Sequence, residues 1–135
     1  MSRSIIEKMA RIVFGEARGE PEEGQLAVAY TIVNRVNHPG YPHSYDGVMN
    51  NGYETLTRPD HDRNWEQARS QNNAEYQRAM RVSEDAFTGR RSNPTGGATC
   101  FATSPNNPAV TDSPYYRATN LCRIGNHYFV GRQAR

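Results

Sequence analysis

Hydrophobic side chains recur three or four positions apart near the start of the chain, which predicts a helix over residues 4–18. The stripe consists of Ile5, Ile6, Met9, Ile12 and Val13. Ser4 can cap the first turn, and Gly19 with Pro21 provides the stop signal. Pro21 then begins a second helix that ends before Pro39. This second helix is hydrophobic over much of its surface, so we expect it to be the central buried helix.

The pattern changes after the second helix. Residues 39–64 are rich in turn-forming residues and predict a long irregular region of the kind that often carries function. A third helical pattern runs from about Trp65 to Phe87, with a break near residues 70–73. Short strands are predicted around residues 99–102 and 124–130. Helices that are followed by short strands predict a mainly α (α+β) fold. We expect a single domain over residues 1–135 with a small C-terminal β ribbon.

Composition narrows the function classes. The chain has 135 residues, is 36% hydrophobic and carries a net charge of +2, which fits one small core and no dedicated nucleic-acid binder. No hydrophobic run approaches the ~20 residues that cross a bilayer, so we expect no membrane insertion. The first residues lack the features of a signal peptide. We therefore expect a protein that is made in the cytosol and reaches any external substrate by another route. We also expect it to be a monomer.

The cysteines and acidic residues give no metal or cofactor pattern. Cys100 and Cys122 form no Cys-x-x-Cys or Cys-His cluster. The favoured interpretation is two buried thiols, although neighbouring ribbon segments would let them form a disulfide in an oxidising space. Adjacent side chains in Asp60-His61-Asp62 cannot easily converge on one ion. We expect neither a metal nor a cofactor.

One carboxyl group continues the first hydrophobic stripe. Glu16 follows Ile5, Met9 and Ile12 at helical steps and so shares their face. Burial disfavours the ionised form of a carboxyl group, which suits a general acid. The alternative is a solvated residue or a partner of Arg18 or Arg35. Glu20, beside Pro21, is expected to cap the second helix.

Three segments in order resemble the SleB-type cell-wall hydrolases, the family of spore cortex-lytic enzymes and their bacterial and phage relatives. The first is ARIVFGEARGEPEEGQLAVAYTIVNRV at residues 10–36, which is long and specific. The others are NPTGGATCF at 93–101 and IGNHYFV at 124–130. Together they span nearly the whole chain.

This resemblance implies a lysozyme-like fold that cleaves the glycan strands of peptidoglycan, as a lytic transglycosylase or a muramidase. It also implies that Glu16 is the catalytic acid. Asn93 departs from the family, which usually has Asp before Pro-Thr, and an amide cannot serve as a carboxylate nucleophile or base.

Other residues are candidates for contacts with the sugar. Aromatic faces and short polar side chains line such clefts, which points to Asn93, Thr95, Phe101 and the tyrosines Tyr41, Tyr45, Tyr53, Tyr115 and Tyr116. The alternatives are that the tyrosines cover the core and that Thr95 caps a turn. His127, in a predicted strand, is expected to be packed and not catalytic.

Two other functions compete with wall cleavage. One is a catalytically inert cell-wall-binding or phage structural module with the same fold. The other is a chitinase-like hydrolase. The biological setting stays open among a phage lysis protein, a virion-associated enzyme and a spore-associated enzyme.

Overall fold

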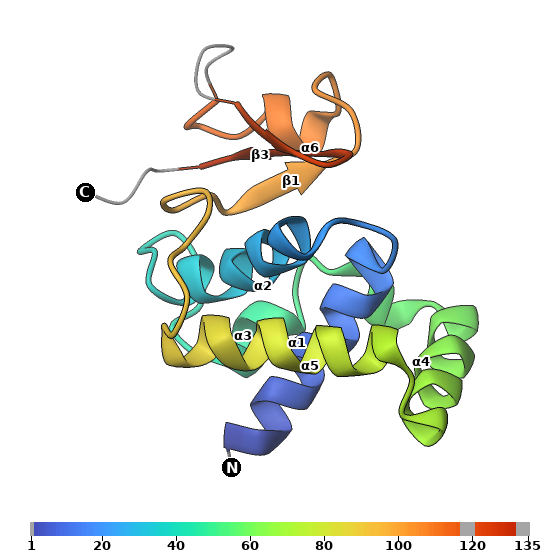
Figure 1. Cartoon of the computed structure of the whole chain (residues 1–135). Coiled ribbons are helices and arrows are strands. Elements are labelled where there is room, and N and C mark those ends of the chain that lie inside the picture. Colours follow the sequence, from blue (N-terminus) through green and yellow to red (C-terminus); the bar gives the residue numbers. More distant parts are fainter. Residues whose placement is uncertain (1, 117–120, 132–135) are drawn as a thin grey trace.

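The computed structural model describes residues 2–116 and 121–131. Within these ranges the chain is mainly helical, with a small sheet, as predicted. Figure 1 shows the sheet lying over one side of the helices, next to α2. The helices are α1 (Ser2–Ala17), α2 (Glu22–Val36), α3 (Tyr45–Met49), α4 (Pro59–Gln71), α5 (Ala74–Thr88) and α6 (Pro108–Thr111), with a short 3₁₀ turn η1 (Glu54–Thr57). The strands are β1 (Cys100–Ala102), β2 (Cys122–Ile124) and β3 (His127–Val130).

Helix α2 is the centre of the helical part, as its hydrophobic surface predicted. Every residue from Gly24 to Ile32 is buried. Helices α1 and α5 both pack against α2 and against each other. The hydrophobic stripe of α1 faces this core, because Met9, Ile12 and Val13 are all fully buried.

The region between α2 and Trp65 contains more regular structure than the sequence indicated. It forms α3, η1 and the first turns of α4, so the expectation of an irregular segment over 39–64 is wrong in this respect. These elements are too short to show a hydrophobic period, and local signals start them. Ser44 Oγ accepts a hydrogen bond from Gly47 N at 3.0 Å, and Pro59 occupies the first turn of α4.

The predicted break after α4 is confirmed at Asn72–Asn73. Asn72 adopts the left-handed conformation, with φ of 49°, which asparagine tolerates better than most residues. Asn73 then caps α5, since its Oδ1 accepts a hydrogen bond from Tyr76 N at 2.9 Å. Two adjacent asparagines therefore end one helix and begin the next.

The C-terminal ribbon is a three-stranded antiparallel sheet in the order β1-β3-β2. The sequence predicted one strand over 124–130, but the structure divides this segment into the end of β2, a turn and β3. Gly125 makes the turn possible with φ of 59°. The error arose because a hairpin between two hydrophobic segments was taken for one continuous strand.

The strand order keeps the two thiols apart. Cys100 lies opposite Val130, Cys122 lies opposite Phe129, and β3 runs between them. Two strand spacings amount to ~9–10 Å, beyond the reach of a disulfide. The disulfide that was left open as an alternative is therefore excluded. Both cysteines are free thiols, and they are half-buried where the favoured interpretation expected buried ones.

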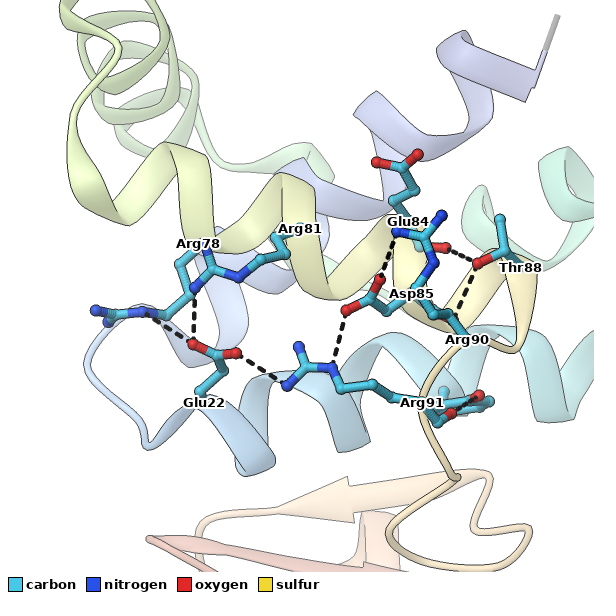
Figure 2. Close-up of polar contacts among 9 residues, drawn as sticks. Glu22, Arg78, Arg81, Glu84, Asp85, Thr88, Arg90 and Arg91 are labelled. Atoms are coloured by element: carbon cyan, nitrogen blue, oxygen red, sulfur yellow. Dashed lines mark hydrogen bonds and ion pairs between the residues drawn. The ribbon is translucent and has the colours of Figure 1, made fainter.

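A network of ion pairs ties the N-terminus of α2 to α5 and to the segment after it (Figure 2). Arg91 Nη1 contacts Glu22 Oε2 at 2.9 Å, and its Nε contacts Asp85 Oδ2 at 2.8 Å. The hydrogen bonds from Arg81 and Arg91 lower the pKa of Glu22. Asp85 is nearly buried, with 10% of its side chain exposed. Arg91 is thus the common partner of two carboxylates on different helices.

We predict that Arg91→Ala destabilises the fold by about 1–3 kcal/mol, because it leaves the buried Asp85 carboxylate without its closest partner. Urea unfolding followed by circular dichroism measures the change. Arg69→Ala is the control, since Arg69 and Glu66 form a pair whose side chains are 50% and 61% exposed. That control is expected to change stability by less than about 0.5 kcal/mol. Equal effects of the two substitutions would contradict a special role for Arg91.

Gly15, inside α1, marks a close approach between α1 and η1. A Cβ atom at this position would overlap the Thr55 methyl group and the His61 ring. Glycine inside a helix normally costs stability relative to alanine. The contact explains why α1 carries a glycine directly before Glu16.

We predict that Gly15→Ala destabilises the protein by about 1–3 kcal/mol through overpacking, instead of giving the gain of ~0.5–1 kcal/mol expected in an open helix. Gly19→Ala is the matched control, because no atom lies within 4 Å of its added Cβ. Thermal unfolding of both variants tests the sign. A stabilised Gly15→Ala protein would show that the approach of η1 is not tight.

Candidate active site

A cleft of about 360 Å³ opens between the end of α1, the C-terminal part of α2 and the sheet. Its walls come from five parts of the chain that are distant in sequence. The lining residues are Glu16, Arg35, Gly52, Arg58, Cys100, Phe101, Ala102, Thr103, Asn107, Ala109 and His127. Strand β1 has β3 on one side only, so its other edge is free of strand pairing within the described sheet. Among the described residues that line the cleft, Glu16 alone carries a carboxyl group.

Glu16 lies in the last turn of α1 and is half-buried. Its Oε2 accepts a hydrogen bond of 2.5 Å from the hydroxyl of Thr55, which is itself 2% exposed. The bond is possible because Gly15 lets η1 approach α1. Neither suggested arginine is paired with Glu16. Arg18 contacts Glu75 at 3.9 Å, and Arg35 donates to the Thr99 carbonyl.

Arg35 brings a fixed positive charge to the cleft. Its guanidinium carbon lies 5.2 Å from the ring centre of Tyr41 and 4.5 Å from that of Tyr53. Its Nε donates to the Thr99 carbonyl at 2.7 Å. Burial raises the pKa of Tyr53 to about 12, and the Tyr53 hydroxyl lies 2.9 Å from Thr31 Oγ1. The aromatic rings and the carbonyl together hold the guanidinium in one orientation.

Glu20 does not cap α2, contrary to the sequence-based expectation. Pro21 occupies the N-cap position and no side chain satisfies that helix end. The Glu20 carboxylate instead accepts hydrogen bonds from Asn126 N at 2.7 Å and Asn126 Nδ2 at 3.1 Å. It thereby holds the β2–β3 turn against the end of α1, where a side chain at Gly125 would overlap it.

The predicted contact residues differ in where the structure places them. Phe101 lines the cleft. Tyr41 lies directly behind the lining, with its hydroxyl 3.6 Å from Cys100 Sγ. Asn93 and Thr95 are absent from the described lining and form a turn, in which Thr95 Oγ1 accepts from Ala98 N at 3.1 Å. Tyr45 packs on Phe87 against the outside of the core, and Tyr53 is buried.

The two remaining tyrosines lie on the segment after α6, and both are half-buried. The Tyr115 hydroxyl is 2.7 Å from His38 Nε2, and the two rings pack edge to face. Tyr116 ends the described segment before residue 121. Neither tyrosine is among the described lining residues.

Sequence reasoning missed several residues of the cleft. His127 was expected to be packed, and it is 4% exposed, yet it also lines the cleft. Thr55, Arg35 and Arg58 carried no recognisable signal, because each depends on a contact or a wall from a distant segment. The position of His127 in the segment IGNHYFV was the one available indication.

The described residues contain no group of three or more His, Cys, Asp or Glu side chains placed to hold a metal ion. In the acidic segment at the start of α4, the side chains diverge. His61 is buried beside Phe14, and Asp62 pairs with Arg11. Within residues 2–116 and 121–131, no helix has the length and hydrophobicity to cross a membrane.

Solved structures share this architecture. The catalytic domain of the germination-specific lytic transglycosylase SleB from Bacillus anthracis matches with a TM-score of 0.64 and 27% identity, over 97% of both chains. The catalytic domain of the Bacillus cereus SleB protein matches with a TM-score of 0.60 and 28% identity, over 97% of this chain and 91% of that one.

Curated proteins show the same relationship at the level of sequence. The spore cortex-lytic enzyme of Halalkalibacterium halodurans is 34% identical over 139 residues, which cover 95% of this chain and 35% of that protein. The spore cortex-lytic enzyme of Bacillus subtilis is 52% identical over 48 residues, covering 36% of this chain and 16% of that protein. The chain thus spans about a third of the length of the first relative. Its match to the second relative covers a smaller share of that protein.

A family model described as Cell Wall Hydrolase matches residues 19–130, from just beyond Glu16 to the end of β3. The match covers most of the chain and agrees with both the sequence relatives and the solved structures. The resemblance noted from three sequence segments is therefore confirmed, and the chain belongs to the Cell Wall Hydrolase family.

Proposed function

We propose that residues 1–135 are a catalytic domain that cleaves the glycan strands of peptidoglycan, with Glu16 as the single general acid and base. The observation that carries this proposal is the position of Glu16. It is the one carboxyl group among the described cleft residues, and a buried hydroxyl fixes one of its oxygens. Family membership and the relatives named spore cortex-lytic enzymes support a cell-wall substrate.

The lack of a second carboxyl group in the described lining favours a lytic transglycosylase. Hydrolysis with retention needs a carboxylate about 5 Å from the acid, and inversion needs one roughly 6.5–9.5 Å away. The family position before Pro-Thr is occupied by Asn93, whose Nδ2 donates to Asn34 Oδ1 at 2.9 Å. The loop and helix aspartates Asp46, Asp60, Asp62 and Asp112 do not line the cleft.

One carboxyl group suffices for the transglycosylase reaction. Protonated Glu16 first gives its proton to the glycosidic oxygen, and the bond from that oxygen to the anomeric carbon breaks. The resulting carboxylate then takes the proton of the same sugar's 6-hydroxyl, whose oxygen bonds to the anomeric carbon. One product ends in a 1,6-anhydro sugar, and the other carries a hydroxyl group where the glycosidic oxygen was. Glu16 is protonated again. The name of the Bacillus anthracis neighbour, a lytic transglycosylase, supports this choice.

The competing functions have less support. A catalytically inert wall-binding or phage structural module gives no reason for a fixed carboxyl group in a cleft. A chitinase-like hydrolase would need the second carboxyl group discussed above. Among the possible settings, the spore cortex-lytic relatives favour a spore-associated enzyme over a phage protein.

We predict that Glu16→Gln lowers wall cleavage by at least about 10²–10⁴-fold while the fold is kept, because glutamine retains the acceptor for Thr55 but donates no acid proton. Release of soluble fragments from purified walls measures activity, and circular dichroism checks the fold. Glu23→Gln is the control, since Glu23 is exposed and changes the charge equally. Glu20→Gln should cost far less than Glu16→Gln. A folded Glu16→Gln protein with near-normal activity would overturn the assignment.

The reaction type predicts its products. Mass spectrometry of digested peptidoglycan should show anhydro-muramyl ends as the main product, each one water lighter than a hydrolysed end. Digestion in ¹⁸O-labelled water should leave these ends unlabelled, because the attacking oxygen comes from the sugar. Labelled reducing ends throughout would instead identify a hydrolase and direct attention to the aspartates outside the described cleft lining.

A further inference from the structure

His127 occupies an unusual position in the cleft. It is the first residue of β3 and is 4% exposed, yet it lines the same cleft as Glu16. The ring of Phe101 meets its ring edge to face at a centroid distance of 5.4 Å, and that of Phe129 lies at 6.1 Å. Two hydrophobic rings therefore pack against the imidazole, whose two nitrogens are its polar atoms.

The two nitrogens have different surroundings. Nδ1 is closed to solvent, has no hydrogen-bond partner and lies 3.7 Å from Glu20 Oε1. A buried nitrogen without a partner in a protein calls for an explanation. Because Nδ1 is enclosed, Nε2 is the nitrogen that a molecule in the cleft can reach.

Glu20 is a fixed neighbour of the imidazole. Its side chain is 11% exposed, and both of its oxygens accept hydrogen bonds from Asn126. A carboxylate facing Nδ1 favours the tautomer in which Nδ1 carries the proton, since an N–H dipole attracts the carboxylate and a lone pair repels it. Nε2 then presents its lone pair to the cleft.

The surroundings of His127 favour the neutral form of the imidazole. Burial lowers the pKa of His127 below its ordinary value, although the charges of Glu20 and Glu16 act in the opposite direction. A neutral ring with a free lone pair accepts hydrogen bonds and does not attract anions. Among the groups of a glycan strand, sugar hydroxyls are the donors that match it.

We propose that His127 is a substrate-binding residue whose Nε2 accepts a hydrogen bond from a hydroxyl of the bound glycan, with Glu20 as the positioning residue that sets its tautomer. This inference rests on the proposed function of the cleft. It gives Glu20, the second glutamate of the segment GEARGE, a role in the cleft beside its role in holding the β2–β3 turn.

The first test separates binding from chemistry by kinetics on soluble glycan fragments of peptidoglycan. We expect His127→Phe, which fits the aromatic surroundings, to lower kcat/KM about ten- to hundredfold, largely through a higher KM. His127→Gln keeps an acceptor and should recover part of the loss. Glu20→Gln should raise KM several-fold, and its effect should not add to that of His127→Phe. His43→Gln, at an exposed histidine, is the control and should match the wild type.

The second test observes the imidazole directly and does not depend on how a His127 variant folds. Long-range ¹H–¹⁵N NMR of the ¹⁵N-histidine-labelled wild-type protein should show the proton of His127 on Nδ1. In the inactive Glu16→Gln variant, titration with the same glycan fragments should shift the Nε2 resonance of His127. A proton on Nε2, or an unchanged Nε2 resonance at saturation, would overturn the proposal.

The Glu16→Gln variant separates a failure of the proposed function from a failure of the role of His127. If wild type cleaves walls and Glu16→Gln does not, the proposed function stands whatever His127 does. In that case a folded His127→Phe protein with wild-type KM and kcat rejects the role of His127 alone. If Glu16→Gln remains active, the assignment of the cleft itself fails.

Discussion

The cleft exists because polar side chains of the helical part hold the backbone of the sheet at two ends. At one end Glu20 binds the β2–β3 turn through Asn126. At the other end, Asn34 donates to the Ala98 carbonyl at 2.8 Å and Arg35 donates to the Thr99 carbonyl at 2.7 Å. These contacts fix the distance between the sheet and α2, which lie next to each other in Figure 1. The cleft walls from α1, α2, β1 and β3 thus keep their relative positions, and no disulfide joins them within the described residues.

The same contacts give Asn93 a structural role. Its amide donates to Asn34 Oδ1, and its own Oδ1 accepts from Thr95 N at 3.2 Å. Asn34 is thereby oriented so that its Nδ2 reaches the Ala98 carbonyl. An amide can donate and accept in this way, whereas an ionised carboxylate only accepts. An asparagine in place of the usual aspartate of the family therefore fits a position that supports the segment before β1 and is not among the described cleft residues.

Local charge in the cleft differs from the net charge of the chain. The total of +2 indicates no particular partner. The cleft nevertheless brings Arg35, Arg58 and the imidazole of His127 to the same walls as Glu16. A glycan strand offers hydroxyl, amide and ether groups, which such a mixture of donors and acceptors suits. Composition cannot show this arrangement, because it records how many charges there are and not which ones face each other.

The sequence by itself determined the long helices and the face on which Glu16 lies. Both follow from the period of the helix, which relates residues only three or four positions apart. The family was also evident from contiguous segments, above all residues 10–36. The turn residues Asn72 and Asn73 carried enough local chemistry to indicate the break between α4 and α5.

Only the tertiary structure decided what surrounds Glu16. Thr55 lies 39 positions from it, and Asn126 lies 106 positions from Glu20. The pairing of β1 with β3 and not with β2 separated the cysteines, and the turn at Gly125 placed His127 at the start of β3. A periodic pattern states which face of a segment is buried, but it does not state which distant segment covers that face. That choice depends on close approaches such as the one at Gly15, where the absence of a side chain brings the hydroxyl of Thr55 to the carboxyl group of Glu16.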